Sequence, residues 1–159
     1  GRKHHDLSTY AGVLSLVEEA KDQQINCLVN NAAIVCPNIN FTDYSPELIK
    51  DMVSVNLTAP ILLTYFLLTN LEKVVNINSM VGLEVKSPRT LYSSTKWGLR
   101  GFSNSLKKEN NKLSILDVYP TNIKTTPDRK NAMDVDMVVG KIYNSFVLGE
   151  TELILDGRK

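Results

Sequence analysis

The sequence contains little cysteine and no long hydrophobic run. Its 159 residues include two cysteines, Cys27 and Cys36, and neither belongs to a metal-ligand pattern. Two cysteines make no disulfide framework, so we expect a reducing, cytoplasmic setting. The most apolar segment, residues 61–68, is too short to span a bilayer, and the first residues lack the pattern of a signal peptide. We therefore expect no membrane partner.

The sequence also lacks an excess of charge of either sign. It has 18 Lys and Arg residues against 17 Asp and Glu residues, and its net charge is +1. Because no basic block occurs, nothing predicts a nucleic-acid partner. His4 and His5 have no cysteine or carboxylate at ligand spacing, so a strand end or a remnant of an added sequence explains them better than a metal site. Length and composition predict one globular domain, residues 1–159.

Helical and strand patterns alternate along the sequence. Ser8 is expected to cap the first helix, and Pro60 to kink the second just before that residue. The first strand is a short apolar run, typical of a strand buried on both faces. This alternation predicts parallel crossovers and an α/β fold with a doubly wound parallel sheet. The predicted helices are 7–24, 45–70, 91–110 and 135–148, and the predicted strands are 25–29, 73–77, 113–119 and 152–155.

Polar residues follow three of the predicted strands. Asn30 and Asn31 follow the first strand, Asn78 and Ser79 follow the second, and residues 120–125 follow the third. In doubly wound sheets, ligands bind beyond the carboxyl ends of the strands. These residues are therefore expected to form the rim of a binding site.

Tyr92 and Lys96 are four residues apart, at the start of the third predicted helix. Side chains at this spacing are neighbours on one helix face. Taken alone, the pair is explained best by a solvated lysine beside a half-buried tyrosine. Its chemical interpretation depends on the other motifs of the sequence.

Five short motifs occur in a recognisable order: L-V-N-N-A-A at 28–33, V-N-L at 55–57, I-N-S at 77–79, Y-x-x-x-K at 92–96 and P-x-x-x-x-T at 120–125. Y-x-x-x-K alone is a weak motif, but the ordered set is specific. From Asp6 onward the sequence resembles the short-chain dehydrogenase/reductase family. The resemblance implies a Rossmann-like fold and hydride transfer between NAD or NADP and an alcohol or carbonyl substrate.

The resemblance assigns roles to four catalytic residues: Asn56, Ser79, Tyr92 and Lys96. A ketone that receives a hydride develops negative charge on its oxygen, so it needs a proton donor and a hydrogen-bond partner. A free tyrosine ionises only near pH ~10, and an adjacent ammonium favours its phenolate form. Tyr92 would be the general acid/base and Lys96 its electrostatic partner, while Ser79 would polarise the substrate oxygen. Asn56 would hold a water at an irregular point of its helix and link Lys96 to solvent.

The resemblance also implies cofactor contacts by Tyr92 and Lys96 and by a further set: Asp6, Asn30, Ala32, Pro120, Ile123 and Thr125. Each has a simpler explanation from its sequence neighbourhood, since Asn30 suits a turn and Asp6 suits a helix N-terminus. In the family, the helices containing Asn56 and Tyr92 commonly form a subunit interface. A homodimer or homotetramer through these helices is therefore expected.

One family motif has no counterpart in this sequence. Short-chain dehydrogenases begin with a strand and a T-G-x-x-x-G-x-G turn that holds the cofactor pyrophosphate. The eight glycines here are scattered, and the sequence begins at a position equivalent to the end of the third strand. Three explanations stay open: an N-terminally incomplete chain, assembly with a second polypeptide, or a non-catalytic relative. The first is favoured because strand 25–29 would otherwise present an exposed hydrophobic edge. The last makes a binding or scaffold protein without cofactor the alternative function.

Overall fold

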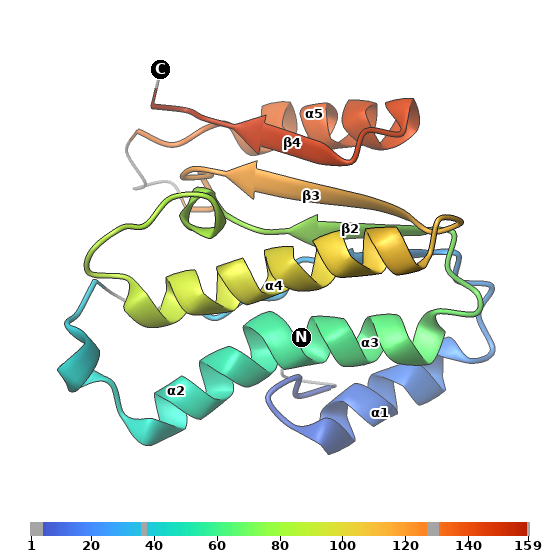
Figure 1. Ribbon diagram of the computed structural model, residues 1–159, viewed down its shortest axis with the longest axis horizontal. Helices are drawn as coiled ribbons and strands as arrows, with labels where there is room; N and C mark the ends of the chain where they lie inside the picture. Colours follow the sequence, from blue (N-terminus) through green and yellow to red (C-terminus); the bar gives the residue numbers. More distant parts are fainter. Residues whose placement is uncertain (1–4, 36–37, 127–130, 159) are drawn as a thin grey trace.

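The computed structural model describes residues 5–35, 38–126 and 131–158, and within them the chain forms a four-stranded parallel sheet (Figure 1). Each strand pairs in parallel with the next one along the chain. The strands, in spatial order, are β1 (Cys27–Asn30), β2 (Lys73–Ile77), β3 (Ser114–Pro120) and β4 (Glu152–Leu155). The α-helices are α1 (Tyr10–Ala20), α2 (Pro46–Val53), α3 (Ala59–Leu67), α4 (Thr90–Glu109) and α5 (Val135–Leu148).

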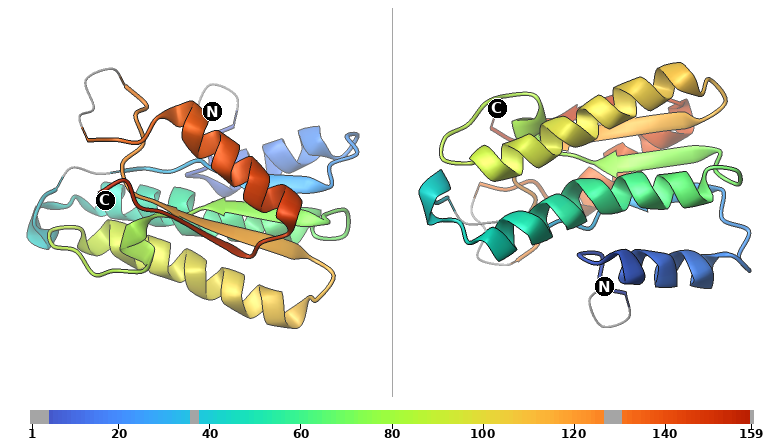
Figure 2. Two further views of the ribbon diagram at one scale, coloured as in Figure 1. Left: turned by 90° about the horizontal axis from the view of Figure 1, so that it is seen from above. Right: turned by 60° about the horizontal axis from the view of Figure 1, so that its bottom comes forward.

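Alternate residues of the central strands face two separate hydrophobic cores. Val74 and Ile115 are register partners and pack with residues of α1 and α3. Their neighbours Val75 and Leu116 point the other way and pack with Val138 of α5. Helices therefore cover both faces of the sheet, with α5 opposite the layer formed by α1, α3 and α4 (Figure 2). The predicted doubly wound parallel sheet is confirmed.

The first helix is shorter than the predicted range 7–24, and its cap differs. The hydroxyl of Ser8 donates to a carboxylate oxygen of Asp6 at 2.8 Å, as does its backbone N–H at 3.0 Å. The cap is Thr9, whose hydroxyl accepts a hydrogen bond from the N–H of Gly12 at 3.0 Å. The predicted Ser8 cap was wrong because Asp6 engages that serine in a tight turn before the helix.

The strand predicted at 25–29 is an edge strand with one covered face. Leu28 packs against the core shared by α1 and α3. Val29 lies on the opposite face and is 56% exposed, although its register partner Val75 is only 3% exposed. The predicted burial of both faces was wrong because, among the described residues, α5 covers β2 to β4 and no element covers this side of β1.

The helix predicted over 45–70 is interrupted where a kink was expected. It divides into α2, a turn of π-helix labelled η2 (Ser54–Thr58), and α3. Pro60 lacks a backbone N–H, so the α-helical ladder cannot continue through it unchanged. Asn56 lies in the wide π turn, which confirms the predicted irregularity at that residue.

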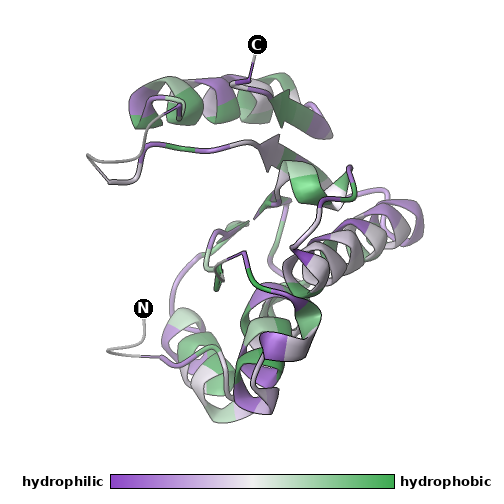
Figure 3. Cartoon of the chain, turned by 90° about the vertical axis from the view of Figure 1, so that its left-hand side faces the viewer, coloured by the Kyte–Doolittle hydropathy of each residue, from purple (hydrophilic) through white to green (hydrophobic). Residues whose placement is uncertain are grey.

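All four strands point their carboxyl ends toward the same side of the molecule (Figure 1). Figure 3 views the chain from that side and shows hydrophilic and hydrophobic residues mixed along the helices. Within the described residues, no helix has the length and apolar character needed to cross a membrane.

The residues considered for a metal site divide between described and undescribed parts of the chain. The ring of His5 contacts a carboxylate oxygen of Glu19 in α1 at 2.7 Å. Cys27 in β1 is a free thiol. His4 and Cys36 lie outside the described residues.

Candidate active site

A cavity of about 260 Å³ opens at the carboxyl ends of the strands. Residues that follow three different strands line it: Asn31 after β1, Ser79 after β2, and Pro120 at the end of β3. Tyr92 and Lys96 of α4 line the same cavity. The topology thus brings together the polar strand ends and the tyrosine–lysine pair, although two of these residues, Asn31 and Pro120, are 89 residues apart in the sequence.

Lys96 is held beneath Tyr92 in an almost fully buried position. Its side chain is 2% exposed, and its Nζ donates to the carbonyl oxygen of Ile77 at 2.9 Å. The same Nζ lies 5.7 Å from the centroid of the Tyr92 ring. Burial lowers the pKa of Lys96 from 10.5 to about 8, because the charged form loses hydration. The pair is therefore a phenol beside a cation whose proton is held less tightly than usual.

Asn78 connects the end of β2 with α4. Its Oδ1 accepts a hydrogen bond from the N–H of Ser79 at 2.9 Å, and its Nδ2 donates to the carbonyl oxygen of Lys96 at 3.2 Å. The short helix η3 (Met80–Gly82) then packs closely on α4. A Cβ at Gly82 would lie 2.7 Å from Oδ1 of Asn78 and 3.2 Å from the oxygen of Lys96, so only glycine fits this approach without a shift.

Asn56 is 1% exposed and does not line the cavity. Its Oδ1 accepts from the N–H of Ile34 at 2.7 Å, and its Nδ2 donates to the oxygen of Ile34 at 2.9 Å. The Nδ2 also lies 3.3 Å from the hydroxyl of Thr95, next to Lys96. Asn56 therefore fastens the loop after β1 to α4, while the water relay expected of it stays a prediction.

The predicted cofactor residues divide into two groups. Those that line the cavity, besides Tyr92 and Lys96, are Pro120, Ile123 and Thr125. Asn30 is instead buried within the sheet, where its Nδ2 donates to Oδ1 of Asn76 at 2.8 Å. Ala32 is exposed beside the cavity-lining residues, and Asp6 lies in the turn before α1. The cofactor roles of all these residues stay predictions.

Several cavity residues were not selected from the sequence. Asn78 was noted only as a polar strand end, and Lys86 and Arg89 were passed over although they lie between Ser79 and Tyr92. Their place between two motif residues was the signal that could have identified them. Two basic residues in a loop are otherwise common on protein surfaces.

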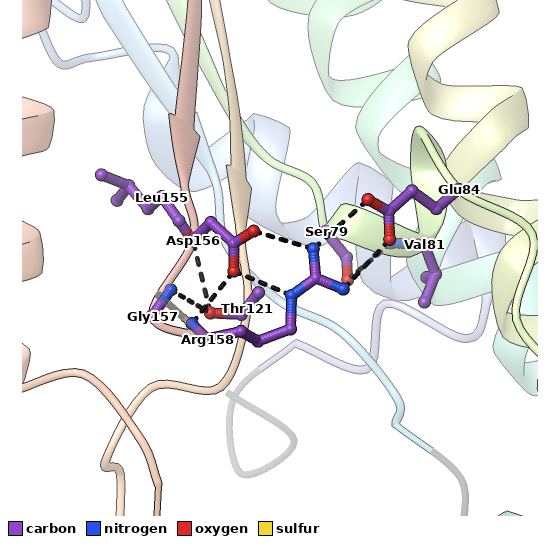
Figure 4. A network of polar contacts seen from close by, with 8 residues as sticks. All are labelled: Ser79, Val81, Glu84, Thr121, Leu155, Asp156, Gly157 and Arg158. Atoms are coloured by element: carbon purple, nitrogen blue, oxygen red, sulfur yellow. Dashed lines mark hydrogen bonds and ion pairs between the residues drawn. The ribbon is translucent and has the colours of Figure 1, made fainter.

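Arg158 also lines the cavity and could not be identified from the sequence. Its guanidinium bonds both carboxylate oxygens of Asp156, at 2.8 and 2.9 Å, and both of Glu84, at 3.1 and 3.3 Å. Figure 4 shows it between these two carboxylates, in the region of Ser79. Arg158 and Glu84 are 74 residues apart in the sequence, so only the fold reveals the pair.

The sheet, its two helical layers and the polar cavity at the strand ends define a Rossmann-like α/β domain. The family model for short chain dehydrogenases matches residues 3–135. The chain therefore belongs to the short chain dehydrogenase family.

Individual proteins and structures agree with this assignment. The chain is 34% identical over 90 residues to a 3-oxoacyl-[acyl-carrier-protein] reductase of Bos taurus, and the match covers 54% of this chain and 38% of that protein. It also resembles the structure of a bulky-bulky ketone specific alcohol dehydrogenase from Comamonas testosteroni, with 25% identity, a TM-score of 0.84, and coverage of 94% of this chain and 63% of the other.

A second solved structure has a higher TM-score at lower identity. It is an alcohol dehydrogenase from the archaeon Thermococcus sibiricus complexed with 5-hydroxy-NADP, with a TM-score of 0.87 and 19% identity. The match covers 95% of this chain and 72% of that structure, and at this identity it supports the fold alone. The chain spans 38% of the bovine protein and 63% of the Comamonas structure.

Proposed function

We propose that this protein is an NAD- or NADP-dependent oxidoreductase that transfers a hydride between the nicotinamide cofactor and an alcohol or carbonyl substrate. The observation that carries the proposal is the convergence of Ser79, Tyr92 and Lys96 on one cavity at the strand ends. The similar bovine protein is named a reductase, and the similar Comamonas structure is an alcohol dehydrogenase. These names support a redox reaction at a carbonyl or alcohol carbon.

The chemistry of the donor groups fits a nicotinamide cofactor. An ammonium has three N–H donors, and within the described residues Lys96 uses one of them, on the oxygen of Ile77. The others are suited to ribose hydroxyls, and Pro120, Ile123 and Thr125 border the same cavity. When bound, the nicotinamide supplies or accepts the hydride. Asp6, Asn30 and Ala32 are proposed as more distant contacts of the same cofactor.

The residues of the chain would donate or accept the proton and orient the substrate. In the reductive direction, the O–H bond of Tyr92 breaks and its proton forms a new O–H bond on the substrate oxygen. The hydroxyl of Ser79 holds that oxygen by a hydrogen bond, and the ammonium of Lys96 stabilises the phenolate that is left. Tyr92 then regains a proton from solvent, and the reverse sequence serves alcohol oxidation.

A fluorescence titration tests cofactor binding by the 159-residue chain. Addition of NADH or NADPH to the purified protein should change the nicotinamide fluorescence. No change with either cofactor at millimolar concentration would contradict the proposal and support the alternative, a non-catalytic binding or scaffold protein. The Tyr92→Phe variant should lose turnover while it keeps cofactor affinity, and unchanged turnover would refute the role of Tyr92.

We also propose that the protein acts as a homodimer or homotetramer. The helices expected at the interface each carry a large exposed aromatic side chain, Tyr65 on α3 at 71% exposure and Trp97 on α4 at 42% exposure. Aromatic side chains are enriched in interfaces relative to the rest of the surface. A single monomer peak in sedimentation at micromolar concentration would contradict this proposal. A cytoplasmic location is proposed from the low cysteine content and the free thiol of Cys27.

A further inference from the structure

The charges around the cavity are strongly unequal. Among the described residues, four basic side chains and one acidic side chain line it: Lys86, Arg89, Lys96 and Arg158 against Glu84. The chain as a whole carries a net charge of only +1. The excess of positive charge is therefore a local property of this cavity.

Two of the four cations already have defined partners. Lys96 lies against the ring of Tyr92 and donates to the oxygen of Ile77. The guanidinium of Arg158 is shared between two carboxylates, Asp156 and Glu84, which offset its charge. Arg158 thus ties the end of β4 to the loop after η3, and Glu84 is no longer available to the other cations.

Lys86 and Arg89 are the two cavity cations that belong neither to the proposed catalytic set nor to the ion-pair network of Arg158. Within the described part of the chain, neither forms an ion pair. Nε of Arg89 donates to the neutral amide oxygen of Asn38 at 2.8 Å, which orients the guanidinium without neutralising it. The more exposed Lys86 lies three residues earlier on the same cavity-lining loop.

The start of α4 increases the positive potential at this point. Arg89 is the N-cap of this 20-residue helix, no side chain caps it, and its first turn contains no acidic residue. The N-terminal end of a helix carries partial positive charge, which a nearby anion stabilises. Tyr92 belongs to the same first turn, so the cations and the proposed acid/base border one end of the cavity.

We propose that the substrate is an alcohol or carbonyl compound that carries an anionic group, a carboxylate or a phosphate, and that Lys86 and Arg89 bind this group. The inference rests on the proposed function for the position of the reacting oxygen at Tyr92. With that oxygen at Tyr92, the anionic end of the substrate would reach the loop before α4. A planar guanidinium suits two-point recognition of a carboxylate or phosphate, and an ammonium adds a point charge.

A matched pair of substrates tests the inference. Keto acids of increasing chain length, each compared with its methyl ester, are assayed for kcat/KM with a saturating cofactor. The wild-type protein should prefer at least one acid over its ester by about tenfold or more. Lys86→Ala and Arg89→Ala should each reduce that preference by about tenfold through KM for the acid, and Arg89→Lys should retain part of it. The control Lys141→Ala removes an exposed cation of α5 outside the cavity and should leave the preference unchanged.

The outcomes separate the substrate from the cofactor as the source of the anion. If the variants raise KM for NADH or NADPH and leave the ratio of acid to ester unchanged, the cations serve a cofactor phosphate and the inference is overturned. Equal turnover of acid and ester by the wild type also overturns it, while the proposed function stands.

If neither compound is turned over, the proposed function fails and binding still tests the inference. Ligand-observed NMR then compares each keto acid with its ester. Acid-selective binding that Arg89→Ala abolishes would support the anion site, and equal binding of acid and ester would overturn it.

Discussion

Asn78 donates a hydrogen bond from its side-chain amide to the carbonyl oxygen of Lys96, at 3.2 Å. The same amide accepts from the N–H of Ser79, so one buried side chain fixes the serine relative to the helix that carries Tyr92 and Lys96. Proposed catalytic groups on two different elements are thus held in register by a residue that does not need to touch the substrate. Positional errors of this kind are costly in catalysis, because the reacting groups must stay within hydrogen-bond reach.

Asn78→Ala is expected to lower kcat by roughly tenfold or more, with a much smaller change in the KM for cofactor. The substitution removes both hydrogen bonds between Asn78 and its neighbours, so the end of β2 is no longer fixed to α4, but it removes none of the proposed catalytic side chains. The control is Thr64→Ala, which removes a buried side-chain hydrogen bond from α3, where the hydroxyl donates to the oxygen of Pro60 at 2.7 Å. Both variants should lower Tm, and equal kcat values in the two would contradict the positioning role of Asn78.

Because Lys96 is buried, we expect the folded protein to be more stable when the amine of Lys96 is neutral than when it is charged. A fall of the pKa from 10.5 to about 8 on folding corresponds to roughly 3 kcal/mol against the charged form. Because the folded-state pKa is the lower one, the unfolded chain binds more protons between pH 8 and pH 10.5. Stability should therefore rise with pH across that window, while the full cost is present below it.

The variant Lys96→Met tests this relation. At pH 7 it should unfold with a free energy roughly 1–3 kcal/mol higher than the wild type, the lost hydrogen bond to Ile77 offsetting part of the gain. The difference should shrink as the pH rises above 8, and turnover should be lost. Urea unfolding at several pH values measures the difference in the free energy of unfolding between the variant and the wild type. A variant that is less stable than the wild type at pH 7 would contradict the proposed cost of burying this ammonium.

Asp117 is expected to be far more important for stability than the other ion-paired carboxylates. It is fully buried in β3, where Lys107 of α4 contacts it at 2.8 Å, Ser103 donates to it at 2.8 Å, and Asn76 donates at 3.2 Å. Removal of one partner from a buried pair leaves an unpaired charge and unsatisfied donors. Asp117→Ala should therefore lower the free energy of unfolding by roughly 3–5 kcal/mol.

The matched control for Asp117 is Glu84, whose pair with Arg158 is half exposed on both sides. Glu84→Ala should change the free energy of unfolding by less than about 1 kcal/mol, because water screens an exposed pair. Chemical denaturation of both variants gives the comparison. Similar losses in the two variants would show that burial does not distinguish these ion pairs.

The sequence predicted the parts of the fold that depend on local patterns. Apolar runs of strand length alternate with helical periods, and this sufficed for the parallel sheet and for the meeting of Ser79, Tyr92 and Lys96 at the strand ends. The sequence alone could not predict contacts between segments that are far apart in the chain. Three features depend on how elements pack: the ion pair of Arg158 with Glu84, the hydrogen bond from the Asn78 amide to Lys96, and the position of Asn30 inside the sheet. Turn chemistry caused the wrong helix cap, since Asp6 engages Ser8 through a local hydrogen bond that competes with capping.

Val29 and Val75 provide the sharpest test of how exposure differs between the edge strand β1 and its neighbour β2 on one face of the sheet. They are register partners on adjacent strands, with side chains on the same face, yet their exposures are 56% and 3%. Truncation of a buried valine loses transfer free energy and leaves a cavity, so Val75→Ala should cost roughly 2 kcal/mol. Val29→Ala should cost less than about 0.5 kcal/mol, because water already reaches most of that side chain.

Urea unfolding of both valine variants at low and high protein concentration checks this contrast. The two substitutions remove the same atoms, one from an edge strand and one from a central strand, so the comparison measures how the strand's position and burial change the cost. A cost for Val29→Ala that grows with protein concentration would mean that a second copy of the chain covers this face. A large cost at every concentration would contradict the exposure of β1 itself. The small, concentration-independent cost is the result expected for an edge strand that keeps one face in water.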